Sequence, residues 1–202
     1  MSRVLLIFGI ALFALMAGAL FYAARIPVQQ EAATRPQPQP AAQIEAMTHP
    51  VFSLPDLEGV NREITEWDGK HKLLNFWATW CAPCRREIPL LKAFQDKHGE
   101  AGLQIIGIAV DYPEEVTQYA ADAEFNYPIL IGQQDAMAVA ESSGIEFIGM
   151  PFTMFVARDG EYLGAYIGEL HQSHLDDVVN ILERLDNGDI NKKEARSALD
   201  LL

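Results

Sequence analysis

The chain has 202 residues, of which 50% are hydrophobic and 21% charged, a balance that supports a folded core and excludes a wholly disordered protein. With 28 acidic and 15 basic side chains its net charge is −13, which disfavours nucleic acid and anionic lipid surfaces as partners. Cysteine occurs at Cys81 and Cys84 alone, so a scaffold of several disulfides and a four-cysteine zinc site are both excluded.

An apolar segment runs from Val4 to Ala24, with an arginine on each side. As a helix of about 21 residues it reaches about 30 Å, the thickness of the hydrocarbon core of a membrane. We therefore expect residues 1–25 to be a retained membrane anchor. The alternative is a cleaved secretory signal that ends near the small residues 17–19. Both interpretations take the rest of the chain out of the cytoplasm.

Residues 26–49 are rich in Pro, Gln and Ala and poor in large apolar side chains. Such a segment buries too little surface to offset its ordering entropy, and its prolines favour extended backbone. We interpret it as a linker that holds the following domain, residues 50–185, away from the membrane. Residues 186–202 are a polar C-terminal extension with a short amphipathic end, for which the sequence indicates no function.

Two almost continuous apolar runs, Leu73–Ala78 and Gln104–Val110, predict strands that are covered on both faces of a sheet. A short N-terminal hairpin is expected over Phe52–Gly59, before the first of them. Between the two runs, apolar residues recur at helical spacing, namely Ile88, Leu91 and Phe94.

Further helices are expected over residues 114–124 and 136–142. Residues 153–157 and 161–167, joined by an Asp-Gly turn, predict an antiparallel hairpin. Ser173 is expected to cap a last helix, whose apolar stripe consists of Leu175, Val178, Val179, Leu182 and Leu185. This order of elements predicts an α/β domain with a mixed central sheet flanked by helices.

The chemistry is concentrated in the motif Trp80-Cys81-Ala82-Pro83-Cys84, where a predicted strand passes into a predicted helix. The first sulfur then lies at a helix N-terminus, where unpaired N–H groups and the helix dipole stabilise a thiolate. Cys81 can attack a disulfide of a partner, and Cys84, one turn along, can resolve the mixed disulfide. We therefore name Cys81 and Cys84 as the catalytic pair.

Three other roles for the cysteines remain open. A purely structural disulfide would close a very short loop and gain little entropy, and a pair of ordinary buried cysteines does not suit the polar, proline-containing setting. A metal site, as in a copper carrier, needs further ligands, for which His171 and His174 are the candidates. These two histidines fit a solvated helix start equally well. We expect neither a metal nor another cofactor.

The segment from Asn75 to Pro89 resembles the active-site segment of the TlpA/ResA group of membrane-anchored thioredoxin-fold proteins. The resemblance extends from about His49 to Leu185. It includes Pro89 within the active-site helix, the strand end Gly107–Asp111 and the segment Gly149–Thr153. It implies a thioredoxin-like fold with an N-terminal hairpin and a central insertion.

The resemblance also implies a cis proline at Pro151 that faces the cysteines, although an X-Pro bond is cis in only about 5% of cases in folded proteins. We expect the surface formed by Trp80, Met150 and Pro151 to contact the substrate.

Proton transfer to and from the cysteines is the point at which the chain departs from thioredoxin. Thioredoxin carries a buried Asp at the position of Asn75, and Asn cannot exchange a proton. The group often supplies a Glu from its central insertion, and Glu114 and Glu115 lie in the matching region. We weigh these two residues as proton-transfer groups against ordinary acidic residues in the first turn of a helix. Glu87 is expected to be a solvated residue on the helix surface.

Ala82 and Pro83 place no charge and no side-chain donor between the cysteines, so we expect a modestly lowered pKa of Cys81 and a reducing couple. The predicted function is that of a thiol:disulfide oxidoreductase, an enzyme that reduces protein disulfides. It would be tethered to the cytoplasmic membrane, with its catalytic domain in the periplasm or outside the cell. The resemblance implies a membrane electron-donor protein upstream and disulfide-bearing proteins downstream.

Cytochrome c maturation is one process that such a reductase can serve. Its dedicated branch is disfavoured, since Phe152 stands where that branch has an acidic residue beside the cis proline. Two other functions remain as alternatives. One is a copper or other metal carrier that uses the cysteine thiolates, and the other is a thiol peroxidase, because the Phe52–Gly59 hairpin is shared with redoxins.

Overall fold

The structure is a computed structural model that describes residues 51–141 and 148–202. The anchor predicted over residues 1–25 and the linker predicted over residues 26–49 lie outside the described residues, so both stay predictions. Within the described ranges, no helix is both long and apolar enough to cross a membrane.

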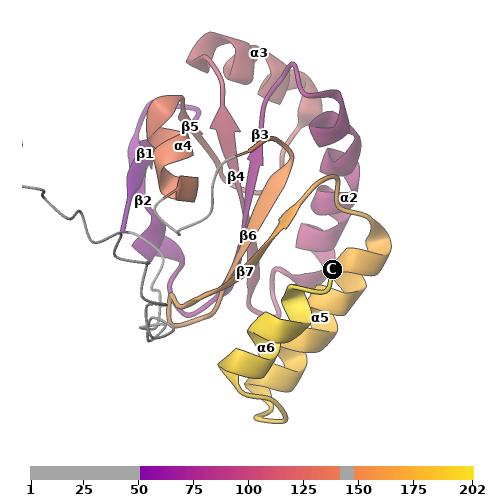
Figure 1. Ribbon diagram of the computed structural model, residues 1–202. Coiled ribbons are helices and arrows are strands. Elements are labelled where there is room, and N and C mark those ends of the chain that lie inside the picture. Colours follow the sequence, from indigo (N-terminus) through magenta and orange to yellow (C-terminus); the bar gives the residue numbers. More distant parts are fainter. Residues whose placement is uncertain (1–50, 142–147) are drawn as a thin grey trace, which may run out of the picture. The chain divides into compact units, whose positions relative to one another are not determined.

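A five-stranded sheet forms the centre of the domain, in the strand order β5-β4-β3-β6-β7 (Figure 1). Its strands are β3 (His71–Trp77), β4 (Leu103–Val110), β5 (Ile129–Gly132), β6 (Phe152–Val156) and β7 (Tyr162–Ile167). β4 pairs in parallel with β3 and β5, whereas β6 pairs antiparallel with β3 and β7. The sheet is mixed, which confirms the predicted α/β fold class.

Helices cover both faces of this sheet (Figure 1). They are α2 (Ala82–His98), α3 (Pro113–Ala123), α4 (Gln134–Glu141), α5 (Gln172–Asp186) and α6 (Lys192–Leu199). Successive strand side chains point to opposite faces, so that Leu73 packs with α2 and α5 in one core, while Leu74 packs with α4 in a second core.

The second core is closed by the N-terminal part of the domain. β1 (Ser53–Pro55) and β2 (Asn61–Glu63) form the predicted hairpin, and a short 3-10 helix, η1 (Ile64–Trp67), follows. Buried side chains from this part contact the sheet face that carries α4, namely Leu54, Ile64 and Trp67.

Two local expectations differ from the structure. The last core helix begins at Gln172 with His171 as its N-cap residue, so the prediction that Ser173 is the cap is wrong. The backbone N–H of His171 is instead bonded to Nδ1 of His174, at 3.2 Å. The strand β5 was not predicted, because a four-residue apolar segment does not distinguish a strand from a buried loop.

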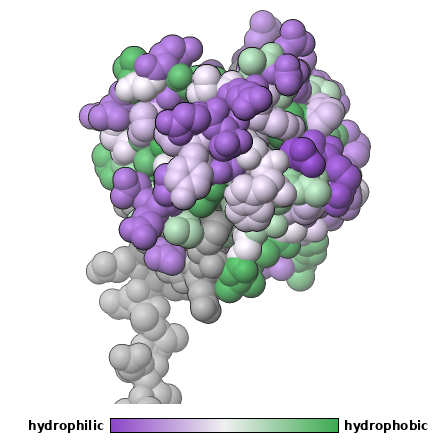
Figure 2. Space-filling view, turned by 90° about the horizontal axis from the view of Figure 1, so that it is seen from above, coloured by the Kyte–Doolittle hydropathy of each residue, from purple (hydrophilic) through white to green (hydrophobic). Residues whose placement is uncertain are grey.

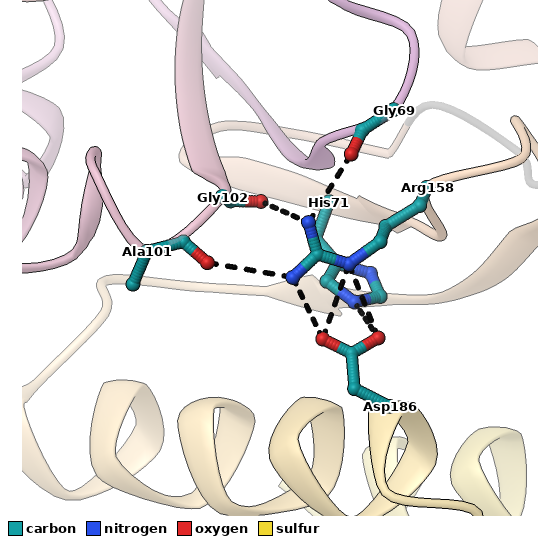
Figure 3. Close-up of polar contacts among 6 residues, drawn as sticks. All are labelled: Gly69, His71, Ala101, Gly102, Arg158 and Asp186. Atoms are coloured by element: carbon teal, nitrogen blue, oxygen red, sulfur yellow. Dashed lines mark hydrogen bonds and ion pairs between the residues drawn. The ribbon is translucent and has the colours of Figure 1, made fainter.

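The end of the sheet where β3 and β4 begin is held together by Arg158 (Figure 3). Its guanidinium pairs with Asp186 at the end of α5 and donates to three backbone carbonyl oxygens, those of Gly69, Ala101 and Gly102. Nε2 of the buried His71 lies 2.8 Å from Oδ1 of Asp186. Burial lowers the pKa of His71 despite this carboxylate. One guanidinium thus joins segments that are far apart in the sequence.

The C-terminal extension packs on the domain through α6, which contacts β7 and α5. Ala195 and Leu199 are buried there. Arg196 Nε donates to the carbonyl oxygen of Tyr162 at 3.1 Å, and Lys192 Nζ lies 2.5 Å from Oε2 of Glu161. The short amphipathic end predicted for residues 186–202 therefore has a structural partner, the edge strand of the sheet.

Candidate active site

Cys81 and Cys84 lie where β3 passes into α2, and they form a disulfide with their Cα atoms 5.3 Å apart. Cys81 is the N-cap residue of α2, and Pro83 stands in the first turn, where its missing N–H costs no helical hydrogen bond. The N–H of Cys84 donates to Cys81 Sγ at 3.3 Å. Cys81 is 5% exposed and Cys84 is 0% exposed. Of the two, only Cys81 offers any surface to a partner.

The loop that leads into Cys81 is fixed by Asp111, at the end of β4. Oδ2 of Asp111 accepts hydrogen bonds from the backbone N–H of Thr79 at 2.9 Å and from its hydroxyl at 2.6 Å. Oδ1 accepts from the N–H of Tyr112 at 2.8 Å. Because Asp111 is buried, these charge-assisted bonds hold the loop firmly against the neighbouring strand.

The residues predicted to contact the substrate surround this loop. Trp80 is 69% exposed, Met150 is half-buried and Pro151 is buried. The Met150–Pro151 peptide is cis, as the resemblance implies. Phe76 of β3 pairs with Phe152 of β6, so Pro151 lies beside the segment that leads into Cys81.

Figure 2 shows the sheet end that carries these loops from above, with pale residues of intermediate hydropathy among strongly hydrophilic ones. Several large apolar or aromatic side chains are exposed near the ends of the strands at this rim, among them Trp80, Tyr112, Ile148 and Ile167. The cysteine pair thus lies in a surface with substantial apolar area.

Glu87 is buried, being only 1% exposed, so the expectation that it is a solvated helix-face residue is wrong. Its Oε1 accepts from Nδ2 of Asn75 at 2.8 Å, and its Oε2 accepts from the backbone N–H of Leu170 at 2.7 Å. Asn75 Nδ2 also donates to the hydroxyl of Thr153 at 3.0 Å. Burial raises the pKa of Glu87 to about 7, although both hydrogen bonds lower it.

The position of Glu87 brings a titratable group to the side of α2 that carries Cys84. The two residues are three apart, and side chains at this spacing are neighbours on a helix surface. The spacing 84, 87, 91 and 94 marks the buried face of α2, and this periodicity is the sequence signal that identifies Glu87 as an inward residue.

Glu114 and Glu115 lie in the first turn of α3, and both side chains are exposed. Acidic residues at this place stabilise a helix through its dipole. In the described ranges, the buried acid on the helix that bears the cysteines is Glu87 instead.

His171 and His174, the candidate metal ligands, lie at the start of α5, and their ring centroids are 5.5 Å apart. No group of three or more His, Cys, Asp or Glu residues with the geometry of a metal site occurs within residues 51–141 and 148–202. The structure thus bonds Asn75 to Glu87, which lies on the same buried face of α2 as Cys84. It gives the two histidines a role at the start of α5.

A family model supplies the first comparison with known proteins. The model of the AhpC/TSA family matches residues 47–162, which are more than half of the chain and include β3, β4, β5 and β6 of the sheet. The chain belongs to the AhpC/TSA family. The match to this family includes both cysteines, Glu87 and the cis proline.

Several proteins with similar sequences are thiol-disulfide oxidoreductases named ResA. The thiol-disulfide oxidoreductase ResA of Geobacillus thermodenitrificans is 34% identical over 115 residues, which are 56% of this chain and 64% of the relative. ResA of Halalkalibacterium halodurans is 30% identical over 133 residues, which are 65% of this chain and 73% of the relative. The chain thus spans a little under two thirds of the first relative. These matches confirm the resemblance to ResA.

Solved structures show the same fold. A thiol:disulfide interchange protein of the thioredoxin family from Chlorobium tepidum TLS superposes with a TM-score of 0.61 at 26% identity, covering 70% of this chain and 97% of that one. A thiol:disulfide interchange protein from Bacteroides sp. gives a TM-score of 0.58 at 25% identity, over 71% of this chain and 90% of that one. The predicted thioredoxin-like fold is confirmed.

Proposed function

We propose that the protein is a thiol-disulfide oxidoreductase that reduces disulfides in partner proteins. The observation that carries this proposal is the disulfide at the N-terminus of α2, with Cys84 fully buried and Cys81 next to the exposed Trp80. In the reduced protein, the thiolate of Cys81 attacks one sulfur of the partner disulfide, and the other partner sulfur leaves as a thiolate. Cys84 then attacks Cys81 Sγ and releases the second partner thiolate. Two electrons pass from the cysteine pair to the partner.

Glu87 is the group that takes the proton of Cys84 in this sequence of steps. Asn75, at the position of the thioredoxin Asp, has no proton to exchange, whereas Glu87 has a pKa raised to about 7 by burial. A base of this pKa is half ionised near neutral pH, where it can accept the Cys84 proton and return it later. This assignment replaces Glu114 and Glu115, which are exposed on another helix.

The direction of electron flow follows from how weakly the site stabilises a thiolate. Within the described residues, the hydrogen-bond donor to Cys81 Sγ is the backbone N–H of Cys84. Of the two arginines that follow Cys84, Arg86 is paired with Glu169, which largely neutralises its charge, and Arg85 is exposed, so that solvent screens its charge. Strong oxidants of this chemistry stabilise their reduced thiolate extensively. The modest stabilisation here favours a reductase.

The site of action that we propose is the outer side of the cytoplasmic membrane, in the periplasm or outside the cell. The apolar segment from Val4 to Ala24 supports a membrane anchor, and the Pro- and Gln-rich residues 26–49 support a spacer. In an oxidising compartment a reductase needs electrons, so a membrane electron-donor protein is part of the proposal. Cytochrome c maturation is one process that it would serve.

Trapping tests the roles of the two cysteines. The full chain carrying Cys84→Ala is reduced and mixed with insulin, which contains accessible disulfides. We expect a stable mixed disulfide through Cys81, and none with Cys81→Ala. Equal trapping by the two variants would overturn the assignment of the nucleophile. A reduction potential near the −120 mV or so of strong periplasmic oxidants, rather than near the roughly −270 mV of thioredoxin, would overturn the reducing direction.

A second experiment tests the proton acceptor. We expect Glu87→Gln to slow resolution of the mixed disulfide by roughly 100-fold near neutral pH, as loss of a general base does. Glu114→Gln, which removes an exposed carboxyl, is the matched control. Slowing by Glu114→Gln and not by Glu87→Gln would return the role to the helix α3. Peroxide consumption by the same preparation, which we expect to be low, tests the thiol peroxidase alternative.

A further inference from the structure

A groove of about 390 Å³ lies between α2 and α3, close to the cysteine pair. The residues that matter for its chemistry are Arg85, Ile88, Pro89, Lys92, Tyr119 and Ala123. The backbone N–H of Arg85 donates to the carbonyl oxygen of Cys81 at 3.1 Å, so the groove begins one helical turn from the nucleophile proposed above. A partner that brings a disulfide to Cys81 has this groove within reach.

Arg85 gives the groove a positive charge that its surroundings do not neutralise. The side chain is exposed, and in the described part of the chain it forms no ion pair, whereas the adjacent Arg86 pairs with Glu169. Lys92, farther along the groove, donates to the carbonyl oxygen of Ala123 at 2.7 Å. A free cation beside the reactive pair is notable in a chain with a net charge of −13.

The groove contains one acidic side chain, at its far end. Asp96 lies there, eleven positions beyond Arg85 or about 16 Å along the helix axis. Its Oδ1 accepts from Nδ2 of Asn126 at 2.7 Å. At this distance across solvent the carboxylate does little to cancel the charge of Arg85.

The groove also offers a backbone acceptor and apolar surface. Pro89 has no N–H, so the carbonyl group of Arg85 lacks its usual donor four residues along the helix. Ile88, Pro89 and Ala123 supply apolar contact area, and Tyr119 contributes an aromatic ring with a hydroxyl. Arg85 and Tyr119 both line the groove, the first from α2 and the second from α3. These features together suit a peptide segment that carries a carboxylate.

We propose that the groove between α2 and α3 is a subsite for the substrate protein, and that it binds an extended segment whose Asp or Glu pairs with Arg85. The inference rests on the proposed function and adds a preference among its substrates. One helical turn separates Arg85 from Cys81, about 6 Å along the axis, and an extended segment advances about 3.3 Å per residue. The acidic residue therefore lies about two positions from the cysteine under attack.

Activated peptides measure this preference directly. Each peptide contains one cysteine as a mixed disulfide with 2-thiopyridine, and Asp, Asn or Lys two positions away from it. The reduced full chain, kept in mild detergent, is mixed with each peptide, and release of thiopyridone gives the rate. We expect the Asp peptide to react roughly two- to fivefold faster than the Asn peptide, as an exposed ion pair allows. The advantage falls as salt is added.

Variants identify the residue responsible. Arg85→Gln removes the preference for the Asp peptide, and Arg85→Glu turns it into a preference for the Lys peptide. Arg86→Gln is the matched control, because it removes the same charge one position away and outside the groove, and it keeps the preference. Each ratio compares peptides on one protein, so a change in the reactivity of Cys81 itself cancels.

Three results would overturn the inference. The first is that the Asp peptide reacts no faster than the Asn peptide with the unmodified chain. The second is that Arg85→Gln keeps the faster reaction of the Asp peptide, and the third is that Arg86→Gln abolishes it as fully as Arg85→Gln does. In each of these cases a normal rate with the Asn peptide keeps the proposed function. If the chain reduces none of the peptides, both the function and the subsite are refuted.

Discussion

Replacing Glu87 with Gln removes a buried carboxyl while nearly preserving its shape. Both oxygens of Glu87 accept hydrogen bonds, from Asn75 and from the backbone N–H of Leu170. The new amide fits if Asn75 turns its own amide, so that its oxygen accepts and the hydroxyl of Thr153 donates to it in turn. The substitution is therefore expected to leave the fold intact and to change chiefly how stability depends on pH.

The magnitude follows from the pKa of Glu87, which burial raises from 4.5 to about 7. Below pH 4.5 the carboxyl is protonated in the folded and the unfolded chain, and the full stability is present. Between pH 4.5 and 7 the unfolded chain ionises first, so the free energy of unfolding falls as the pH rises. Above pH 7 both states are ionised, and the loss reaches about 3 kcal/mol. Glu87→Gln does not ionise and avoids this loss.

Denaturant unfolding of the oxidised protein between pH 4 and pH 8 measures the effect. The difference in unfolding free energy between Glu87→Gln and the unmodified chain removes the contribution of all other groups. We expect this difference to rise by about 3 kcal/mol in favour of the variant as the pH increases from 4.5 to 7. Glu114→Gln is the control, with a difference within about 1 kcal/mol. A difference that is flat between pH 5 and pH 8 would refute the raised pKa.

Three other substitutions test the packing and the positioning of the site. Gly107→Ala places a methyl group 2.7 Å from Cδ1 of Ile129, and we expect denaturant unfolding to show a loss of about 1–3 kcal/mol. Asp111→Asn removes a charged acceptor from Thr79 and is expected to lower both stability, by about 1–3 kcal/mol, and the exchange rate; an unchanged rate would show that Asp111 does not position the loop. Arg158→Met, at the other end of the sheet, is expected to cost about 1–3 kcal/mol in unfolding experiments, while a fall in the exchange rate of the folded variant would contradict its purely structural role.

The cysteine pair and the central strands were predictable because their signals are local. The run Leu73–Ala78 is apolar at almost every position, which indicates burial on both faces, and Cys81 comes three positions after its end. A strand followed by a helix then fixes the first sulfur at a helix N-terminus, whatever the rest of the chain does. The position of Cys81 therefore depends on a short stretch of sequence and not on contacts with distant residues.

The environment of Glu87 was not predictable in the same way. Glu87 lies on the buried face of α2, but a charged side chain is usually found at the surface. The hydrogen-bond donors that allow its burial are distant in sequence. Asn75 comes from β3, and the N–H of Leu170 is contributed by the connection that precedes α5, 83 positions away. A buried acid is tolerable only where such partners converge, and convergence of this kind is a property of the folded chain.

The helix α2 presents different residues to its two sides, and this divides the chemistry of the site from its selectivity. The inward side carries Cys84 and Glu87, which are buried and to which we assign the transfer of electrons and protons. The side next to α3 carries Arg85 and Pro89, which line the groove and contact solvent. Since neither outward residue is bonded to the buried acid in the described ranges, substrate preference can change without altering the pKa of Glu87. Substitutions on the inward side are expected to slow all substrates alike.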